Sequence, residues 1–306
     1  MILIQKIRNR YYWLLRKIKK YRDLAYYKYA GDKAYIRKRY REEFGEKLNL
    51  KDPVTFNEKL QWLKLYDRNP LYTQLVDKYR VREYIAQKLG EEYLIPLLWV
   101  GDDPDDIDFD TLPDQFVLKC NHNSGKGMCI CRDKSTLNYT EVRNELRKGL
   151  QENFYLNSRE WPYKNVHRKI ICEQYMKDGS GTEGLTDYKF FCFNGAAKIM
   201  YISNDFSKEP RTDFFDMDFN HLSIRIKDPP ADIAPQKPEH FEKMKQFAEI
   251  LSKDIPHLRV DFYLIKGKIY VGELTFYHSA GFARITPDEW NLQMGEWIKL
   301  PKKRKH

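Results

Sequence analysis

The sequence predicts an α+β protein, and three observations support this fold class. Helix-like patterns dominate the first 90 of the 306 residues. From Phe116 onward, short apolar runs alternate with turn signals, and two runs meet at Asn194–Gly195, a dipeptide typical of two-residue β-hairpin turns. Antiparallel hairpins after a helical region fit an α+β architecture better than a doubly wound parallel sheet.

The basic character of the chain is concentrated at its start. The formal net charge is +10, yet residues 1–41 contribute +12 and the rest of the chain is slightly acidic. We expect basic helices here, which either lie on an anionic membrane surface or pack on the protein itself. The run is too charged for a signal peptide, and no stretch reaches the roughly 18 apolar residues of a membrane span.

The following elements are predicted from periodicity and stop signals. Residues 56–65 have helical spacing and end at a stop over 67–70, and residues 71–90 are predicted as one helix ended by Gly90. A short strand at 91–101 and an acidic connector at 102–115 come next. The remaining predictions are paired strands at 116–121 and 128–132, helices at 139–156 and 240–255, a strand at 169–176, hairpins at 187–204 and 257–277, and irregular chain at 205–235.

The five cysteines all lie in apolar, strand-like runs. Their odd number and spacing do not suggest a disulfide framework, so we expect reduced thiols that pack in the core of a cytoplasmic protein.

The segment FVLKCNHNSGKGMCICR raises the first functional question. Lys119 occupies a strand position where an apolar residue is expected, and the loop that follows is rich in Asn and Gly. The loop 121–127 is either a plain hairpin turn or a phosphate cradle built from backbone N–H groups. Its spacing matches neither a P-loop nor a dinucleotide-binding fingerprint. Lys78 lies upstream in DKYRVREY, where a helical lysine would usually face solvent.

The final predicted hairpin carries two carboxylates in apolar strands, Asp261 and Glu273. Burying a carboxylate costs several kcal/mol unless it is paired or binds a metal. A two-residue turn at Lys266–Gly267 would place the two on opposite faces, so we predict a three-residue loop that brings them together, with Thr275 on the same face. They would then bind Mg²⁺; the alternative is an ion pair with Arg259.

Five motifs in order resemble the TupA-like (teichuronopeptide-type) ATP-grasp proteins of bacterial surface-polysaccharide loci. The resemblance covers roughly residues 50–290. The motifs are DKYRVREY, LPDQFVLKCNHNSGKG, REWPY, DYKFFCFNG and RVDFYLIKGKIYVGELTFYHSAGF.

The resemblance implies an ATP-grasp fold in which two α+β subdomains clamp ATP. The implied organisation is a basic helical segment (1–45), a helical region before the ATP-grasp unit (46–115), a lid subdomain (116–176) and a C-terminal subdomain with the Mg²⁺ site (177–306).

The resemblance also implies roles for individual residues. Lys78 and Lys119 would contact the nucleotide phosphates under a lid formed by Ser124, Gly125, Lys126 and Gly127. The adenine would lie along Glu173, Gln174, Tyr175 and Met176, and Asp187 and Lys189 would lie near the ribose and γ-phosphate. The Mg²⁺ ligands would be Asp261, Glu273 and Thr275, where Thr275 replaces the usual asparagine. Arg211 and His278 are candidates for the acceptor or γ-phosphate side, with Lys119 as a further catalytic candidate.

The implied function is an ATP- and Mg²⁺-dependent carboxylate–amine ligase that modifies a surface polysaccharide or its precursor, for example by amidating a uronic acid. Its partners would be ATP, a sugar carboxylate and an amine, at the inner face of the membrane. Two alternatives remain open, an ATP-grasp sugar kinase and a glycosyltransferase, although the sequence has no metal motif of the latter class beyond Asp216–Met–Asp218. Nucleic acid is not an expected partner, because the positive charge is confined to one terminus.

Overall fold

The computed structural model describes residue 26 and residues 29–178, 184–204 and 210–303. Most of the basic segment 1–41, and with it the predicted membrane contact, lies outside the described residues. Its last part forms helix α2 (Asp32–Phe44), which buries Tyr35, Ile36 and Tyr40 against the protein. Within the described residues, no helix is both long and apolar enough to cross a membrane.

Helix α2 packs in a small helical group with α3 (Phe56–Tyr66) and α9 (Asp288–Trp297). Thr55 and Glu58 form a capping box that starts α3, because each side chain accepts a hydrogen bond from the other's backbone N–H. Helices α3 and α9 lie in close contact at Gly295, where an added Cβ would lie 2.1 Å from the Val54 carbonyl oxygen. Helix α9 was not predicted, whereas α3 and its stop at Asp67 confirm the sequence pattern.

The predicted single helix over 71–90 is wrong. The chain forms α4 (Leu71–Val76) and α5 (Val81–Lys88), separated by a turn at 77–80. The Asp77 carboxylate accepts hydrogen bonds from the backbone N–H groups of Tyr79 and Arg80, which competes with continuation of the helix. This turn places Lys78 between the two helices.

The first sheet is antiparallel and four-stranded, in the order β1–β4–β2–β3. Helix α6 (Tyr139–Gln151) packs on β2 and β3, ends earlier than predicted, and is followed by the short helix α7 (Tyr155–Ser158). Strand β1 lies outside the segment 116–176 that was predicted to form the lid. The strands are β1 (Leu97–Gly101), β2 (Phe116–Cys120), β3 (Met128–Cys131) and β4 (Ile170–Gln174).

The second sheet has six antiparallel strands in the order β10–β9–β5–β6–β7–β8. Helix α8 (Phe241–Leu251) packs on β5, β6 and β9. Strands β7 and β8 correct the prediction of irregular chain over 205–235. The strands are β5 (Asp187–Phe193), β6 (Ala196–Asn204), β7 (Arg211–Asp216), β8 (His221–Leu222), β9 (His257–Ile265) and β10 (Lys268–Thr275).

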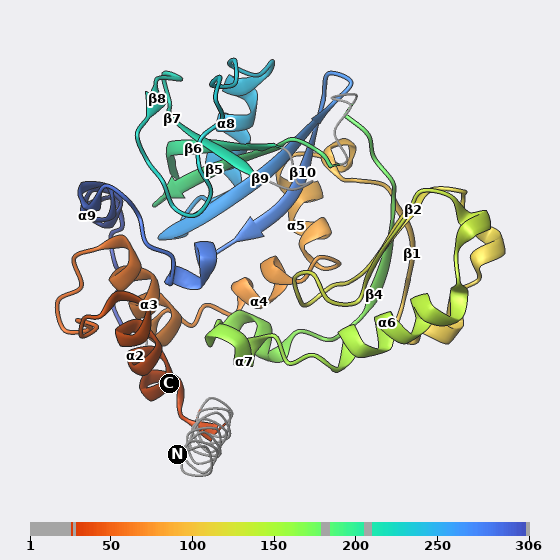
Figure 1. The fold of residues 1–306 in the computed structure, drawn as a ribbon, viewed down its shortest axis with the longest axis horizontal. Coiled ribbons are helices and arrows are strands. Elements are labelled where there is room, and N and C mark those ends of the chain that lie inside the picture. Colours follow the sequence, from red (N-terminus) through yellow and green to blue (C-terminus); the bar gives the residue numbers. More distant parts are fainter. Residues whose placement is uncertain (1–25, 27–28, 179–183, 205–209, 304–306) are drawn as a thin grey trace, which may run out of the picture.

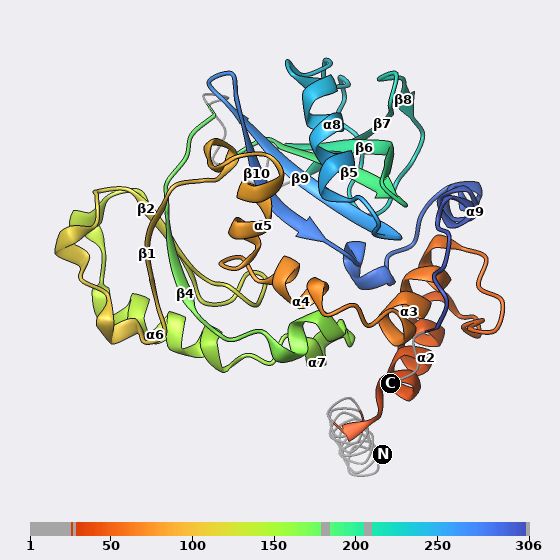
Figure 2. The ribbon, with the colours of Figure 1, turned by 180° about the vertical axis from the view of Figure 1, so that it is seen from behind.

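The two sheets face each other across a central space, with α4 and α5 between them (Figure 1). The view from behind shows the same arrangement, with α6 on the outer side of the four-stranded sheet (Figure 2). Each sheet has its own hydrophobic core, and the larger core extends into the α2–α3–α9 group. The structure therefore consists of two α+β units, each built on one antiparallel sheet.

Helix α7 and the chain that follows it are tied to the N-terminal helices. The Tyr35 hydroxyl and the Arg39 guanidinium both donate to the carbonyl of Asn157, at 2.6 and 2.9 Å. The Lys64 ammonium donates to the carbonyl of Ser158 at 3.0 Å. The indole of Trp161, in the 3₁₀ helix η5 (Trp161–Asn165), donates to the carbonyl of Asp67.

Candidate functional site: a cleft between the two sheets

A cavity of about 470 Å³ lies between the four-stranded sheet and the β9–β10 hairpin. Residues from both sheets line it, including Lys119 and Glu173 on one side and Tyr263 and Gly272 on the other. A smaller adjoining cavity continues from Lys119 and Glu173 to Lys78 and Glu273. The volume of the larger cavity is in the range of small-molecule and cofactor sites.

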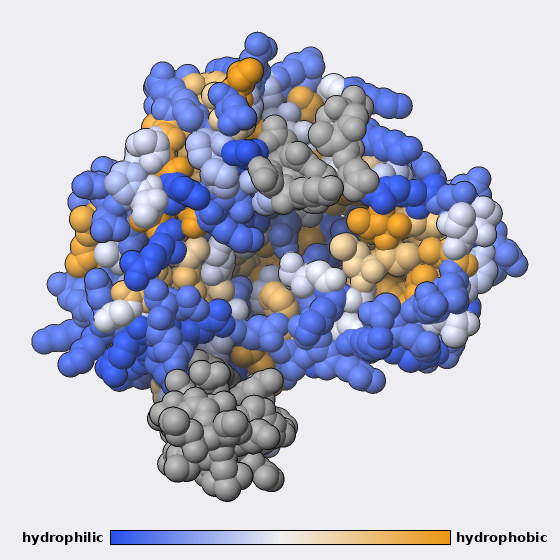
Figure 3. Space-filling model, in the orientation of Figure 1, coloured by the Kyte–Doolittle hydropathy of each residue, from blue (hydrophilic) through white to orange (hydrophobic). Residues whose placement is uncertain are grey.

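One part of the cleft is apolar. Val117, Met128 and Ile130 line it from the four-stranded sheet. Met128 and Ile130 are two residues apart in β3, so they share a face, and they are 46% and 45% exposed. Figure 3 shows a hydrophobic patch on this side of the central hollow. Gln174, Tyr175 and Met176 complete this part of the lining, at and beyond the end of β4.

The other part of the cleft is cationic. Lys119 and Glu173 lie on adjacent strands, and the Lys119 Nζ is 2.6 Å from the Glu173 Oε2. The Arg82 Nη1 lies 3.8 Å from the other Glu173 oxygen. Glu173, which was predicted to lie beside the adenine, lines the larger cavity, and its carboxylate also pairs with Lys119. An anion that bound Lys119 would therefore have to compete with Glu173.

Lys78 lies at the same end of the cleft. Its Nζ donates to the carbonyl of Asn123 at 2.6 Å and is 3.8 Å from the Glu273 Oε1. Its backbone N–H donates to the carbonyl of Asn121, so the turn after α4 is joined to the β2–β3 loop. Burial lowers the pKa of Lys78, although Glu273 opposes the shift. The expectation of a solvent-facing lysine is therefore wrong.

The β2–β3 loop has a buried base and an exposed tip. Asn121 is fully buried, and its amide group donates to Asp77 and to the carbonyl of His167. His122 is also buried at the base, with its Nε2 3.1 Å from the carbonyl of Glu152. The predicted lid residues Ser124, Gly125 and Lys126 form the exposed tip, where Lys126 pairs with Glu152 at 3.2 Å. The loop is thus a hairpin connection with a solvent-exposed tip at 124–126, whereas the fourth predicted lid residue, Gly127, is buried.

The β9–β10 hairpin brings Asp261 and Glu273 together as predicted, but not for the predicted reason. The turn has two residues, Lys266 and Gly267, both with positive φ. A β-bulge at Gly272 shifts the register by one residue, so that Glu273 is paired with Asp261. A Cβ on Gly272 would lie 2.8 Å from the ring of Tyr263, which explains why the bulge carries glycine.

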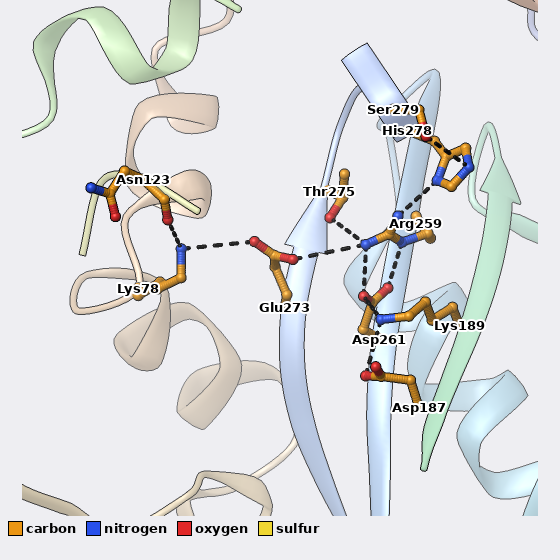
Figure 4. A network of polar contacts seen from close by, with 10 residues as sticks. All are labelled: Lys78, Asn123, Asp187, Lys189, Arg259, Asp261, Glu273, Thr275, His278 and Ser279. Carbon is orange, nitrogen blue, oxygen red and sulfur yellow. Dashed lines mark hydrogen bonds and ion pairs between the residues drawn. The ribbon is translucent and has the colours of Figure 1, made fainter. Parts of the chain in front are cut away.

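Asp261 adopts the arrangement that the sequence left as the alternative to metal binding. The Arg259 Nε and Nη2 each donate to one Asp261 oxygen at 2.7 Å, and the Lys189 Nζ donates to Oδ2 at 2.6 Å (Figure 4). Burial would raise the pKa of Asp261, but the two cations outweigh it and the pKa is lowered. Asp261 is therefore a buried anion whose two oxygens are both already bound.

The other two predicted metal ligands differ in availability. The Thr275 hydroxyl accepts a hydrogen bond from the Arg259 Nη2 at 3.0 Å. The Glu273 carboxylate has looser partners, with Lys78 and Arg259 each 3.8 Å away, and its side chain is 38% exposed. Among the residues that the structure describes, no group of three or more His, Cys, Asp or Glu side chains is gathered as a metal site.

Asp187 and Lys189 join the same network, and the Lys189 Nζ lies 3.0 Å from the Asp187 Oδ1. Burial raises the pKa of Asp187 to about 6 despite this contact. His278 is buried with its Nδ1 2.7 Å from the Arg259 Nη1, and burial and Arg259 hold its pKa well below the usual value. Arg211 lies elsewhere: its guanidinium donates to the carbonyl of Pro230, and Thr212 rather than Arg211 faces the network.

Sequence reasoning missed two residues that organise this site. Arg259 was considered only as a possible partner of Asp261, yet it contacts Asp261, Glu273, Thr275 and His278 (Figure 4). Its position two residues before Asp261 placed it on the same strand face, a signal that was present in the sequence. Arg82 reaches Glu173 from α5, and no pattern in the sequence indicated that contact.

The chain has similarities to a protein family and to several solved structures. No curated protein is similar enough in sequence to count as a relative. Among solved structures, a Bacillus anthracis D-alanine–D-alanine ligase complexed with ATP matches with 16% identity and a TM-score of 0.42, over 66% of this chain and 55% of that one. A Helicobacter pylori D-alanine–D-alanine ligase matches with 13% identity and a TM-score of 0.44, over 79% and 69%. The model of the family described as TupA-like ATPgrasp matches residues 58–299, so the chain belongs to this family.

Proposed function

We propose that the protein is an ATP- and Mg²⁺-dependent carboxylate–amine ligase that modifies a bacterial surface polysaccharide or its precursor, for example by amidating a uronic acid. The observation that supports this most is the cleft between the sheets. It has an apolar part for a base and a cationic end with Lys78 and Lys119 for phosphates. Such a protein would work in the cytoplasm, at the inner face of the membrane where the basic N-terminus would be attracted.

The residues present fit a nucleotide. Val117, Met128 and Ile130 offer an apolar surface to one face of the adenine, and the chain at 174–176 offers backbone groups to its edge. At the other end, Lys119 would exchange Glu173 for phosphate oxygens, and Lys78 would keep its position through Asn123. The loop tip 124–126 would close over the phosphates.

For Mg²⁺, the loosely paired carboxylate of Glu273 supports the proposal better than the full set of three predicted ligands does. Mg²⁺ in nucleotide sites commonly takes one or two carboxylates together with phosphate oxygens. Glu273 has an exposed carboxylate at the cationic end and would hold the ion. Asp261 and Thr275 would contribute only after giving up contacts with Arg259. The bound ion would supply charge neutralisation on the phosphates.

In the proposed reaction, a carboxylate oxygen of the acceptor attacks the γ-phosphorus of ATP. A new O–P bond forms, the bond to the β,γ-bridging oxygen breaks, and ADP leaves with that electron pair. The amine then attacks the carbonyl carbon, phosphate leaves, and the nitrogen loses a proton to solvent. Lys78, Lys119 and Arg259 would stabilise the negative charge during these steps, because positioned cations in a water-poor site act strongly on a transferring phosphoryl group.

The test is calorimetric titration of the full chain with Mg-ATP. Lys119→Ala should abolish detectable binding and Glu273→Ala should weaken it at least tenfold, whereas Lys148→Ala, a surface lysine paired with Glu145, should bind like the parent. If both site variants bind Mg-ATP like the parent, the assignment is wrong. Products separate the reaction classes: ADP with inorganic phosphate and an amide supports the ligase, and a phosphorylated sugar would show a kinase.

A further inference from the structure

Helix α3 carries two fully buried polar side chains, Gln61 and Lys64, and packs against the 3₁₀ helix η6 (His278–Gly281), which follows β10. The two residues are three positions apart, so they lie on the same face of α3. Neither is among the described residues that line the two cavities of the cleft. Because a lysine is almost never fully buried unless its ammonium is paired, the contacts of Lys64 need an explanation.

The Lys64 ammonium binds two backbone carbonyls from distant parts of the chain. Its Nζ donates to the carbonyl of Ala280 in η6 at 2.5 Å and to the carbonyl of Ser158, the last residue of α7, at 3.0 Å. It also lies 4.4 Å from the centre of the Phe282 ring, within the range of a cation–π contact. Burial lowers the pKa of Lys64 to about 7, although Glu160 opposes the shift. Lys64 thus joins the end of α7 to η6 through a side chain that is costly to bury.

The backbone that these donors hold has an unusual conformation. Ser279, Ala280 and Gly281 have φ angles of +47°, +54° and +65°. Residues other than glycine rarely adopt such angles, and they keep them where the surrounding structure enforces them. The Gln61 Nε2 donates to the carbonyl of Gly281 at 2.7 Å and to that of Ala280 at 3.2 Å. The two side chains of α3 therefore stabilise a turn that the sequence of η6 does not favour by itself.

The same turn begins with His278, which contacts Arg259 (Figure 4). The His278 ring is neutral, because burial and Arg259 hold its pKa well below the usual value. Since a guanidinium has donors only, the His278 Nδ1 accepts from the Arg259 Nη1 at 2.7 Å, and the ring proton is on Nε2. The Arg259 Nη2 lies 3.8 Å from Glu273, which lines the cleft. The position of η6 therefore sets one contact of the guanidinium that borders the cleft.

We propose that Lys64 is a positioning residue which, with Gln61, holds η6 in its left-handed conformation. This conformation keeps His278 in contact with the Arg259 guanidinium at the end of the cleft. Lys64 acts through the turn and touches no ligand. The effect on catalysis rests on the proposed ligase function, in which Arg259 stabilises the transferring phosphoryl group. The effect on His278 rests on the contacts alone.

Nitrogen-15 NMR of the full chain, labelled at histidine, tests the positioning directly. The His278 signal, identified by its loss in His278→Gln, should show a proton on Nε2 only. Lys64→Met and Gln61→Met remove the donors at similar side-chain length, and both should give a mixture of the two tautomers. Lys59→Met is the matched control on the same helix, because Lys59 donates to the carbonyl of Ile298 at 2.9 Å, and it should leave the signal unchanged. A parent-like His278 signal in Gln61→Met would overturn the proposal, even where Lys64→Met does not fold.

Turnover separates failure of the positioning from failure of the ligase. In an active ligase, Gln61→Met should lower kcat about tenfold and keep the parent's KM for ATP, because a misaligned Arg259 loses contact with the transition state rather than with the bound nucleotide. If the His278 signal changes as expected and the parent forms no amide, the ligase function fails and the positioning stands. If the parent forms amides and Gln61→Met changes neither kcat nor the His278 signal, the positioning fails and the ligase stands.

Discussion

Gly127 ends the β2–β3 loop where the loop touches helix α6, and replacing it tests how that contact is built. Its φ is +63°, and a Cβ would lie 2.7 Å from the Cys120 Sγ and 2.7 Å from the Gly149 Cα. A left-handed alanine costs about 1–2 kcal/mol. Overpacking a tight contact adds about 1–3 kcal/mol. We therefore expect Gly127→Ala to lower the free energy of unfolding by about 2–5 kcal/mol, a large share of a typical domain's stability.

A matched control exists in the same loop. Gly125 also has a positive φ, +87°, but a Cβ there would meet nothing within 4 Å. Gly125→Ala should therefore cost only the backbone term, about 1–2 kcal/mol. Gly149→Ala provides the reverse case: alanine favours a helix by about 1 kcal/mol over glycine. Its Cβ would nevertheless lie 2.5 Å from the Gly127 Cα, so a net loss is expected.

Urea unfolding at equilibrium, followed by circular dichroism, measures all three variants. Gly127→Ala should be less stable than Gly125→Ala by about 1–3 kcal/mol, because only Gly127 is in tight contact with its surroundings. If the two variants lose the same free energy, steric contact with α6 is not the cause. If Gly149→Ala is more stable than the parent, helix propensity dominates and the close approach of loop and helix has no energetic weight.

Two further predictions concern the core and the cleft. His257 is buried, and burial lowers its pKa to about 3, so the unfolded chain takes up a proton below about pH 6.5 that the folded chain does not. Stability should thus fall as the pH falls from about 6 to 4, with His257 contributing about 1.4 kcal/mol per pH unit. In His257→Asn, the change in the free energy of unfolding per pH unit, measured by urea unfolding at several pH values, should decrease by that amount. An unchanged pH dependence would contradict a neutral His257. Separately, Gly272→Ala should push the Tyr263 ring and weaken Mg-ATP binding about tenfold in calorimetry, about 1.4 kcal/mol; affinity equal to the parent would show that the ring does not border the nucleotide.

The hairpin at 257–277 shows what the sequence could predict about the fold. The alternating apolar residues were enough to identify both strands, and the cost of burying two carboxylates was enough to place Asp261 beside Glu273. The cause of their alignment could not be predicted, because a bulge at Gly272 and a three-residue turn would both pair Asp261 with Glu273. The helix break at Asp77 was missed for a related reason: a side-chain hydrogen bond, not a proline or glycine, ends the helical pattern.

The sequence predicted which residues gather at the candidate site better than it predicted which cation contacts which carboxylate. The structure gathers Lys78, Lys119, Glu173 and Glu273 at one cleft, as the family resemblance implied. Periodicity cannot say which carboxylate each cation contacts, because that depends on side-chain reach across neighbouring strands. In the structure Lys119 pairs with Glu173 and Asp261 pairs with Arg259, while their phosphate and metal contacts stay predictions. Arg211 lies next to Thr212 in β7, and because adjacent residues in a strand face opposite sides, only Thr212 lines the cavity beside the Asp261–Arg259 network; the role of Arg211 stays a prediction.

The ties between the N-terminal helices and the chain before β4 also have a mechanical consequence. Asp32, the first residue of α2, lies 3.2 Å from Arg68 and hydrogen-bonds Tyr155, while Tyr35 and Arg39 hold Asn157. A force applied to the chain ahead of Asp32 would pass through α7 to the strand that carries Glu173. If that end of the protein were anchored to a surface, tension on it would be transmitted to one wall of the cleft. The position of the four-stranded sheet would then depend on the force applied at the N-terminal end.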